Sequence, residues 1–276
     1  MDRSRFAGWL AEAKRRVCGV HSRGFSAKQR FHLAALLIAL AALPLHAQSS
    51  TNEDDIQFDP AITQEEFGKF SRVVAQGIYA SPVEPARAGG LLRFDVGVAV
   101  TAVPVDTNST YWRRAVRDDF TVSNYIAVPK LIVSKGFSVV NLSASYAKVN
   151  DSDIRMWGGA VDVPIIRGGI ATPSLAVRGA YSTIDGVDVY KLKTYGAEVF
   201  LSKGFGPLTP YGAVGRMRSD AEGRINFATG SSTLTDKSDV NRYTLGLRIS
   251  LLLPKITIEA TQAEERSYAA KVSFGF

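Results

Sequence analysis

The feature that most constrains this fold is the alternation of apolar with small or polar residues between Gly90 and Phe276. It runs in segments of about ten residues separated by turn residues, and no helical period persists there. Successive side chains of a strand point to opposite faces, so the pattern predicts β-strands with one apolar face each. Ten such segments are expected, at 91–103, 125–134, 138–148, 154–165, 173–183, 190–202, 209–218, 241–251, 255–263 and 267–276.

The connectors between these segments alternate long and short. The long ones are 104–124, 149–153, 184–189, 219–240 and the brief 264–266, and the short ones are 135–137, 166–172, 203–208 and 252–254. Long loops at one end and tight turns at the other, with an even number of strands that can each cross a bilayer, are typical of transmembrane β-barrels. Residues 89–276 are therefore expected to form an all-β, antiparallel barrel of about ten strands (8–12). A secreted soluble β-sandwich is the alternative.

Charged residues in the middle of these strands lie on the polar faces. A basic side chain that faced lipid at the bilayer midplane would cost about 2–4 kcal/mol, and several would approach the whole stability of a domain, about 5–15 kcal/mol. We therefore expect the charges to point inward and to pair across the lumen. The expected network is Arg93, Asp95, Lys130, Asp162, Arg178, Glu198, Arg216, Arg248, Glu259 and Lys271.

The width of such a barrel bears on transport. A barrel of about eight strands is filled by its own side chains, while an open channel needs about sixteen. A largely filled lumen is expected here. Inward glycines leave gaps, so a narrow conduit stays open as an alternative; they are Gly97, Gly158, Gly196, Gly212, Gly246 and Gly275.

Residues 1–47 have the pattern of a cleaved secretory signal peptide. A basic stretch precedes the apolar run 33–43, and Leu45-His46-Ala47 offers a small residue before the cut. The run is too short to span a membrane, and a buried or anchoring helix is the alternative. The segment holds eight of the 33 basic and two of the 26 acidic residues, so the mature chain is nearly neutral and no nucleic-acid partner is expected.

The stretch 48–88 is expected to be a periplasmic leader that carries one short helix. Thr63 and Glu66 form a capping-box pattern, and apolar residues follow at helical spacing from Phe67 to Ile78. This predicts an amphipathic helix over 63–78, ended by Ser81-Pro82. Because a narrow barrel leaves little room for a helix, we expect it to pack on the barrel rim as a stalk or strap. A plug inside the lumen is the alternative.

The C-terminus is the most specific motif. The chain ends on Phe276, with Phe274, Val272, Ala270 and Tyr268 at alternate positions before it. This ending resembles the C-terminal β-signal of bacterial outer-membrane proteins. Together with the export signal and the strand pattern, the resemblance implies a Gram-negative outer-membrane β-barrel, at the level of the class. It implies the outer-membrane assembly machinery, outer-membrane lipid and lipopolysaccharide as partners.

Aromatic residues near the predicted strand ends fit the same class, because amphipathic rings prefer the headgroup level. They are Tyr125, Phe137, Tyr181, Tyr195, Phe205, Tyr211, Tyr243, Tyr268 and Phe276.

The residues available for chemistry narrow the function. The only cysteine, Cys18, and all three histidines lie within 1–47, so the mature chain has neither thiol nor imidazole catalysis. Carboxylates remain, and Asp118-Asp119 and Asp151-x-Asp153 lie in expected outer loops, where such acids are usually just solvated. We expect no catalytic residue, cofactor or metal.

The first long loop holds the best candidate for a binding patch. Aromatic and guanidinium groups together grip anionic sugar or phosphate groups. The candidate residues are Tyr111, Trp112, Arg113, Arg114 and Arg117. A solvated loop folded over the barrel mouth is the favoured interpretation of the same residues.

The function expected from these observations is a non-enzymatic outer-membrane barrel with a charge-paired lumen and a structural or ligand-binding role. Two alternatives stay open. One is a narrow, porin-like channel or transporter for small solutes. The other is a surface lipid or peptide hydrolase that uses carboxylates only.

Overall fold

A computed structural model describes residues 56–86, 90, 93–116, 124–149, 153–169, 171–227, 230–251 and 253–275. All described residues belong to one compact unit, His46–Phe276. The expected signal peptide, 1–47, lies outside the described residues. Among the helices of the described residues, none is long and apolar enough to cross a membrane.

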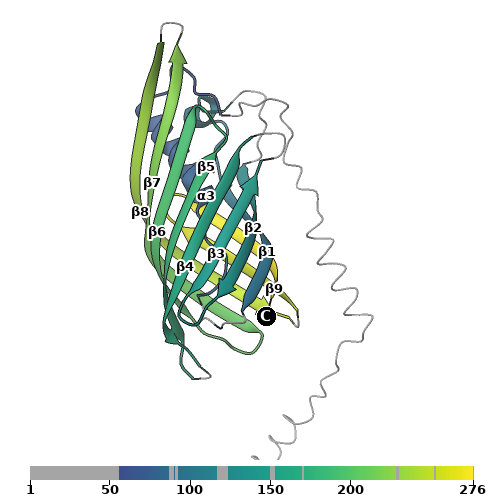
Figure 1. Cartoon of the computed structure of the whole chain (residues 1–276). Helices are drawn as coiled ribbons and strands as arrows, with labels where there is room; N and C mark the ends of the chain where they lie inside the picture. The colour runs from purple at the N-terminus through teal and green to yellow at the C-terminus, as the bar shows by residue number, and fades with distance from the viewer. Residues whose placement is uncertain are drawn as a thin grey trace, which may run out of the picture. The chain divides into compact units, whose positions relative to one another are not determined.

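Ten antiparallel strands close into a barrel, as the alternating pattern predicts (Figure 1). Each strand pairs with its neighbours in sequence, and β1 pairs with β10 to close the ring, with Val98 opposite Val272. The strands are β1 (Phe94–Pro104), β2 (Tyr125–Gly136), β3 (Asn141–Lys148), β4 (Arg155–Arg167), β5 (Ser174–Asp185), β6 (Tyr190–Ser202), β7 (Leu208–Phe227), β8 (Gly230–Ser250), β9 (Pro254–Gln262) and β10 (Arg266–Gly275).

Strands β7 and β8 are much longer than expected, and the predicted loop 219–240 is wrong. The two strands stay paired from Leu208↔Ile249 to Phe227↔Gly230 and extend well beyond their neighbours in Figure 1. On β7 the inward positions of the extension stay apolar or small, as at Ala221 and Ile225, while charged residues such as Glu222 and Arg224 point outward. The alternation therefore continues through 219–240, but the charged residues on one face make the segment resemble a loop in composition.

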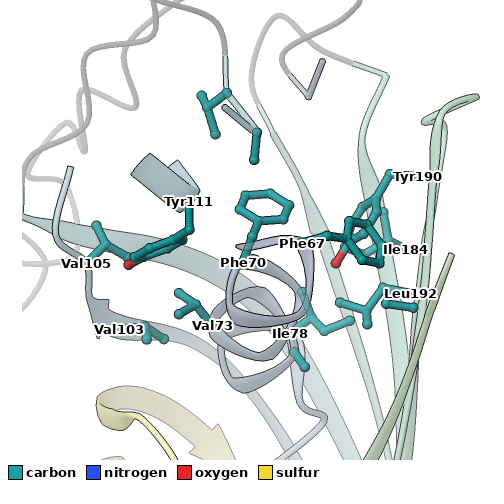
Figure 2. Close-up of a cluster of buried hydrophobic side chains, with 14 of the residues drawn as sticks. Phe67, Phe70, Val73, Ile78, Val103, Val105, Tyr111, Ile184, Tyr190 and Leu192 are labelled. Atoms are coloured by element: carbon teal, nitrogen blue, oxygen red, sulfur yellow. The ribbon is translucent and has the colours of Figure 1, made fainter. Parts of the chain in front are cut away.

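A helix lies inside the barrel. Helix α3 (Gln64–Ile78) begins at the predicted capping box, where Thr63 Oγ1 accepts from the backbone N–H of Glu66 and Glu66 accepts from that of Thr63. It contacts strands around most of the ring, among them β1, β5, β6, β8 and β10. Figure 2 shows Phe67 and Phe70 on this helix facing Tyr190 and Tyr111 of the surrounding wall and loop. The expected place on the rim is therefore wrong, and the helix is a plug.

The chain continues from α3 through the lumen as an extended segment, 79–86. Lys130 Nζ donates to Tyr79 O at 2.9 Å, Lys271 Nζ to Pro82 O at 2.9 Å and Ser202 Oγ to Ala86 O at 3.2 Å. The inward glycines make the room: a Cβ on Gly196 would overlap Tyr79 Oη, and one on Gly158 would overlap Ala80 Cβ. The N-terminal segment thus fills the gaps at Gly158 and Gly196, and Tyr211 fills the one at Gly246, whereas Gly212 lies on the outward face beside Leu245 and does not border the lumen.

The direction of this plug is given by its contacts. Near its start, the backbone N–H groups of Gln57 and Asp59 donate to Ala115 O and Arg114 O of the long β1–β2 loop. At its far end, Ala86 meets Ser202 beside the short β6–β7 turn. Residues 56–86 therefore run from the long-loop end to the short-turn end, where β1 begins, and line the interior rather than form a leader outside it.

The outward face of the barrel is apolar. Leu245 is 74% exposed, and Val98, Val214, Leu201 and Ile258 share this face with it. Exposed aromatic rings share this face. Tyr125, Phe137, Trp157, Phe205 and Tyr268 lie at or near strand ends, while Tyr181, Tyr195 and Tyr243 lie further inside their strands. Tyr211 is the exception, because it points inward and donates to Glu259 at 2.6 Å. Phe276 lies outside the described residues.

Candidate functional site

The interior of the barrel gathers most of the charged residues singled out in the sequence. Eight of these side chains lie on the inward face of their strands: Asp95, Lys130, Asp162, Arg178, Glu198, Arg248, Glu259 and Lys271. Arg93, directly before β1, also points inward and pairs with Glu84. Six of them form three groups around the plug, and each group joins the barrel wall to residues 76–86.

The first group is a buried pair between adjacent strands. Arg178 on β5 binds Asp162 on β4 through two bonds, Nε to Oδ1 at 2.5 Å and Nη2 to Oδ2 at 2.9 Å. The two residues are Cα partners in the sheet, so their side chains leave the wall side by side. Arg178 also donates to Glu84 O of the plug at 3.1 Å and stacks over the ring of Phe200.

The second group fastens the end of α3. Glu198 on β6 accepts from Tyr79 Oη at 3.1 Å and from Arg242 Nε on β8 at 3.3 Å. Arg242 also donates to Gln76 Oε1 at 2.7 Å and lies 4.0 Å from the centre of the Tyr79 ring. Arg242 was not among the predicted network residues, although its spacing from Arg248 places the two on the same face of β8.

The third group lies at the seam between β1 and β10. Lys271 Nζ is 3.4 Å from Asp95 and 3.5 Å from Glu84 of the plug, and Glu84 also pairs with Arg93 at 3.2 Å. Lys255 on β9 reaches Asp95 at 2.8 Å. Glu84 and Lys255 were missed, since neither the plug nor a strand-end lysine was assigned to the lumen.

The remaining carboxylate, Glu259, lies between plug and wall. It accepts from Tyr211 Oη at 2.6 Å and from Ser81 Oγ at 3.4 Å. Each carboxylate of the lumen network is thus held by a cation or a hydroxyl of the barrel or plug. Among the described residues, no three His, Cys, Asp or Glu side chains come together as a metal site.

Arg216 does not belong to the lumen. Its side chain points outward, is 68% exposed, and pairs with Asp239 of β8 at 3.1 Å. The next outward residue, Arg218, is the Cα partner of the exposed Tyr195. A charge that faces outward is costly only where the surface is covered by lipid, which is the apolar band. At Arg216, β7 passes from that band into its charged extension.

The aromatic patch of the first loop is also different from expectation. Thr110–Arg113 form a short helix, α4, whose Tyr111 and Trp112 are buried against the plug; the Trp112 and Phe70 rings lie 5.9 Å apart. Arg114 binds Glu66 at 2.9 Å and Ala61 O at 3.1 Å, while Arg113 is exposed. These groups hold the outer end of α3 and do not form an open binding surface. Arg117 lies outside the described residues.

Comparisons with known proteins were made for sequence and fold. No family model matches this chain. No curated protein matches its sequence. Among solved structures, the chain is similar to the outer membrane protease OmpT from Escherichia coli, with a TM-score of 0.40 and 8% identity over 68% of this chain and 98% of that one.

Two further structures are similar at the same level. One is LpxR from Salmonella typhimurium, with a TM-score of 0.35 and 12% identity over 66% of this chain and 100% of that one. The other is the N-terminal β-barrel domain of Pseudomonas aeruginosa OprF, with a TM-score of 0.32 and 12% identity over 66% and 97% of the two chains. At identities this low, the likeness concerns the barrel fold alone.

Proposed function

We propose that this protein is a bacterial outer-membrane β-barrel, exported with a cleaved signal peptide. The single observation that supports this best is a closed barrel whose outward face is apolar and edged by aromatic rings while its charges point inward. A soluble protein rarely leaves so large an apolar surface in water, whereas lipid covers it without cost. Outer-membrane lipid, lipopolysaccharide and the assembly machinery are the partners that such a barrel would have.

Within that class, the proposed role is non-enzymatic: a closed barrel with a structural or ligand-binding function. The plug occupies the lumen, and the carboxylates of the network are held by Arg, Lys, Tyr or Ser side chains. A general acid or base needs a proton-transfer path to a substrate, and groups locked against the plug offer none. The alternative of a carboxylate-only hydrolase has less support from this arrangement.

A narrow channel is the second candidate. It is favoured by the way the plug is held, through polar bonds such as Tyr79–Glu198 and Lys271–Pro82 O. Water can replace such polar bonds if residues 56–86 move, and that movement would open a passage lined by charged groups.

Planar-bilayer recording separates a closed barrel from a channel. The purified wild-type protein should show no steady single-channel current, and deletion of residues 56–86 should produce one, since the deletion empties the lumen. Arg216→Met, which changes only an outward side chain, is the matched control and should behave as wild type. Heat-modifiable mobility on gels verifies that each variant folds.

A second variant covers the case in which the deletion does not fold. Glu84→Gln with Glu198→Gln loosens the plug while keeping its bulk, and should give brief, flickering openings. A large steady current from the wild type would overturn the closed-barrel proposal and support the channel. Partition of the folded protein into the aqueous phase without detergent would overturn the membrane assignment.

A further inference from the structure

Arg248 differs from the other buried cations of the barrel. It lies on the inward face of β8 near the short-turn end and is 2% exposed. Its Cα partners are Thr209 on β7 and Thr257 on β9, neither of which carries a charge. Within the described chain, its Nε and Nη2 atoms have no hydrogen-bond partner. A guanidinium keeps its charge in proteins, so burial leaves these donors in need of an acceptor.

Arg178 shows what such an acceptor looks like. Its exposed fraction is 0%, and its Nε and Nη2 atoms bind the two oxygens of one carboxylate, Asp162. The same two atoms are the free ones of Arg248. This edge of a guanidinium matches a group with two adjacent oxygens, which is a carboxylate or a phosphate.

A cavity of about 310 Å³ lies at Arg248. It is formed with the β4–β5 and β6–β7 turns, its lining includes Arg167, and no carboxylate lines it. Two hydroxyls of its wall are already used as donors: Ser202 Oγ to Ala86 O and Ser174 Oγ to Arg167 O. The charge of the lining is therefore cationic, and Arg248 provides the free buried donors.

We propose that Arg248, with Arg167 at the mouth of the cavity, binds an oxyanion group at the short-turn end of the lumen. The ligand is a small phosphate or carboxylate held by two parallel bonds to Nε and Nη2 of Arg248. The cavity is at the small end of the range for ligand sites, so it accepts a small anion or a single anionic group of a larger molecule. In an outer-membrane barrel this end faces the periplasm, where both kinds of anion occur.

Thermal unfolding of the purified, detergent-folded barrel tests the site. In buffer with chloride as the only anion, added inorganic phosphate or succinate should raise the unfolding midpoint saturably, because a ligand bound only to the folded state stabilises it. The anion that raises the midpoint at the lower concentration shows whether the site prefers a phosphate or a carboxylate. Arg248→Met should abolish the response, and Arg248→Lys, which keeps the charge but loses the two-bond edge, should weaken binding about tenfold or more.

Arg216→Met is the matched control, because it removes an outward arginine and should leave the response unchanged. A second readout distinguishes binding from structure. Without phosphate or succinate, Arg248→Met should unfold no earlier than wild type, since the Nε and Nη2 donors of the buried arginine have no partner in the described part of the protein. Absence of a saturable response in the wild type, or a full response in Arg248→Met, would overturn the proposal. Neither result depends on whether the barrel conducts ions.

Discussion

At the residue scale, single small side chains decide whether the plug fits. Gly196 on β6 faces Tyr79, and Gly158 on β4 faces Ala80, in each case with no space for a methyl group. The outward Gly179 on β5 has open space around its Cβ position instead. The barrel therefore uses its inward glycines to admit its own N-terminal segment.

Substitution of these glycines tests the fit. Gly196→Ala should destabilise the folded barrel by about 1–3 kcal/mol, the usual cost of overpacking, because the new methyl group displaces Tyr79. Gly179→Ala is the matched control on the neighbouring strand and should change stability by less than about 0.5 kcal/mol. Guanidinium unfolding in detergent, followed by tryptophan fluorescence, measures both. Equal stabilities of the two variants would show that the plug does not press against β6.

Glu66, at the start of the plug helix, is a residue through which pH is expected to act on the plug. Burial disfavours its ionised form, but hydrogen bonds from Thr63, Thr110 and Arg114 outweigh this and lower its pKa from 4.5 to about 2. A carboxylate with a depressed folded-state pKa stabilises the fold above its unfolded pKa, and that contribution is lost as pH falls through the folded value.

The lowered pKa of Glu66 determines how a variant without this carboxylate should respond to pH. Glu66→Gln should unfold more easily than wild type at pH 6–7, and the difference should shrink between about pH 4.5 and pH 2 and then disappear. Denaturant unfolding across that range measures it. Glu65→Gln, on the same helical turn but exposed, is the control and should show little difference at any pH. A Glu66→Gln deficit that persists unchanged at pH 2 would contradict the assignment.

At the element scale, the β7–β8 extension and α4 together hold the outer end of α3. Gln64 Nε2 donates to Thr235 O at 2.7 Å, and Arg72 pairs with Asp236 at 3.2 Å. Across the helix, Trp112 of α4 packs on Phe70. The long β7–β8 hairpin thus extends beyond the barrel and also holds one side of α3, while α4 holds the other.

Shortening the hairpin should release the helix without opening the barrel. Replacing 220–237 by an Asn-Gly turn removes Asp236 and the Thr235 carbonyl but leaves the rest of the ring paired. Limited trypsin digestion should then cut after Lys69 or Arg72, while heat-modifiable mobility persists. Replacing only 226–231 keeps both contacts and is the matched control. Continued protection of α3 in the longer deletion would show that the hairpin does not hold it.

At the scale of the whole molecule, the path of the chain through the barrel sets which end each segment reaches. Asp59 lies at the long-loop end, bonded to Arg114 O, while Ser138 lies in the short β2–β3 turn. In outer-membrane barrels the long loops face outside the cell and the short turns face the periplasm. Asp59, near the start of the plug segment, should therefore lie at the cell surface.

Cysteine labelling tests this arrangement. In a Cys18→Ser background, a membrane-impermeant maleimide added to intact cells should label Asp59→Cys and not Ser138→Cys. Permeabilising the outer membrane should make Ser138→Cys reactive, which verifies that the site itself is accessible. Labelling of Ser138→Cys alone in intact cells would mean that the barrel has the opposite orientation.

The strands and the closed antiparallel barrel could be predicted from sequence, because alternation of side chains is a local property. Val98 and Leu245 face outward, and Asp95 and Arg248 inward, as their positions in the alternation require. The capping box likewise predicted where α3 begins, since Thr63 and Glu66 bond within one helical turn. Such features depend on neighbours along the chain and need no knowledge of the fold.

Only the tertiary structure decided what fills the barrel and which charges meet. Tyr79 and Glu198 lie 119 positions apart, and Trp112 packs on Phe70 only because the plug brings α3 beneath the first loop. Arg216 points outward because β7 rises beyond the apolar band, which the alternation alone does not reveal. Alternation is local, so it sets which side chains of a strand share a face. Which of the two faces of β7 turns inward, and which partner a charge meets across the lumen, depend on closure of the ring around the N-terminal segment.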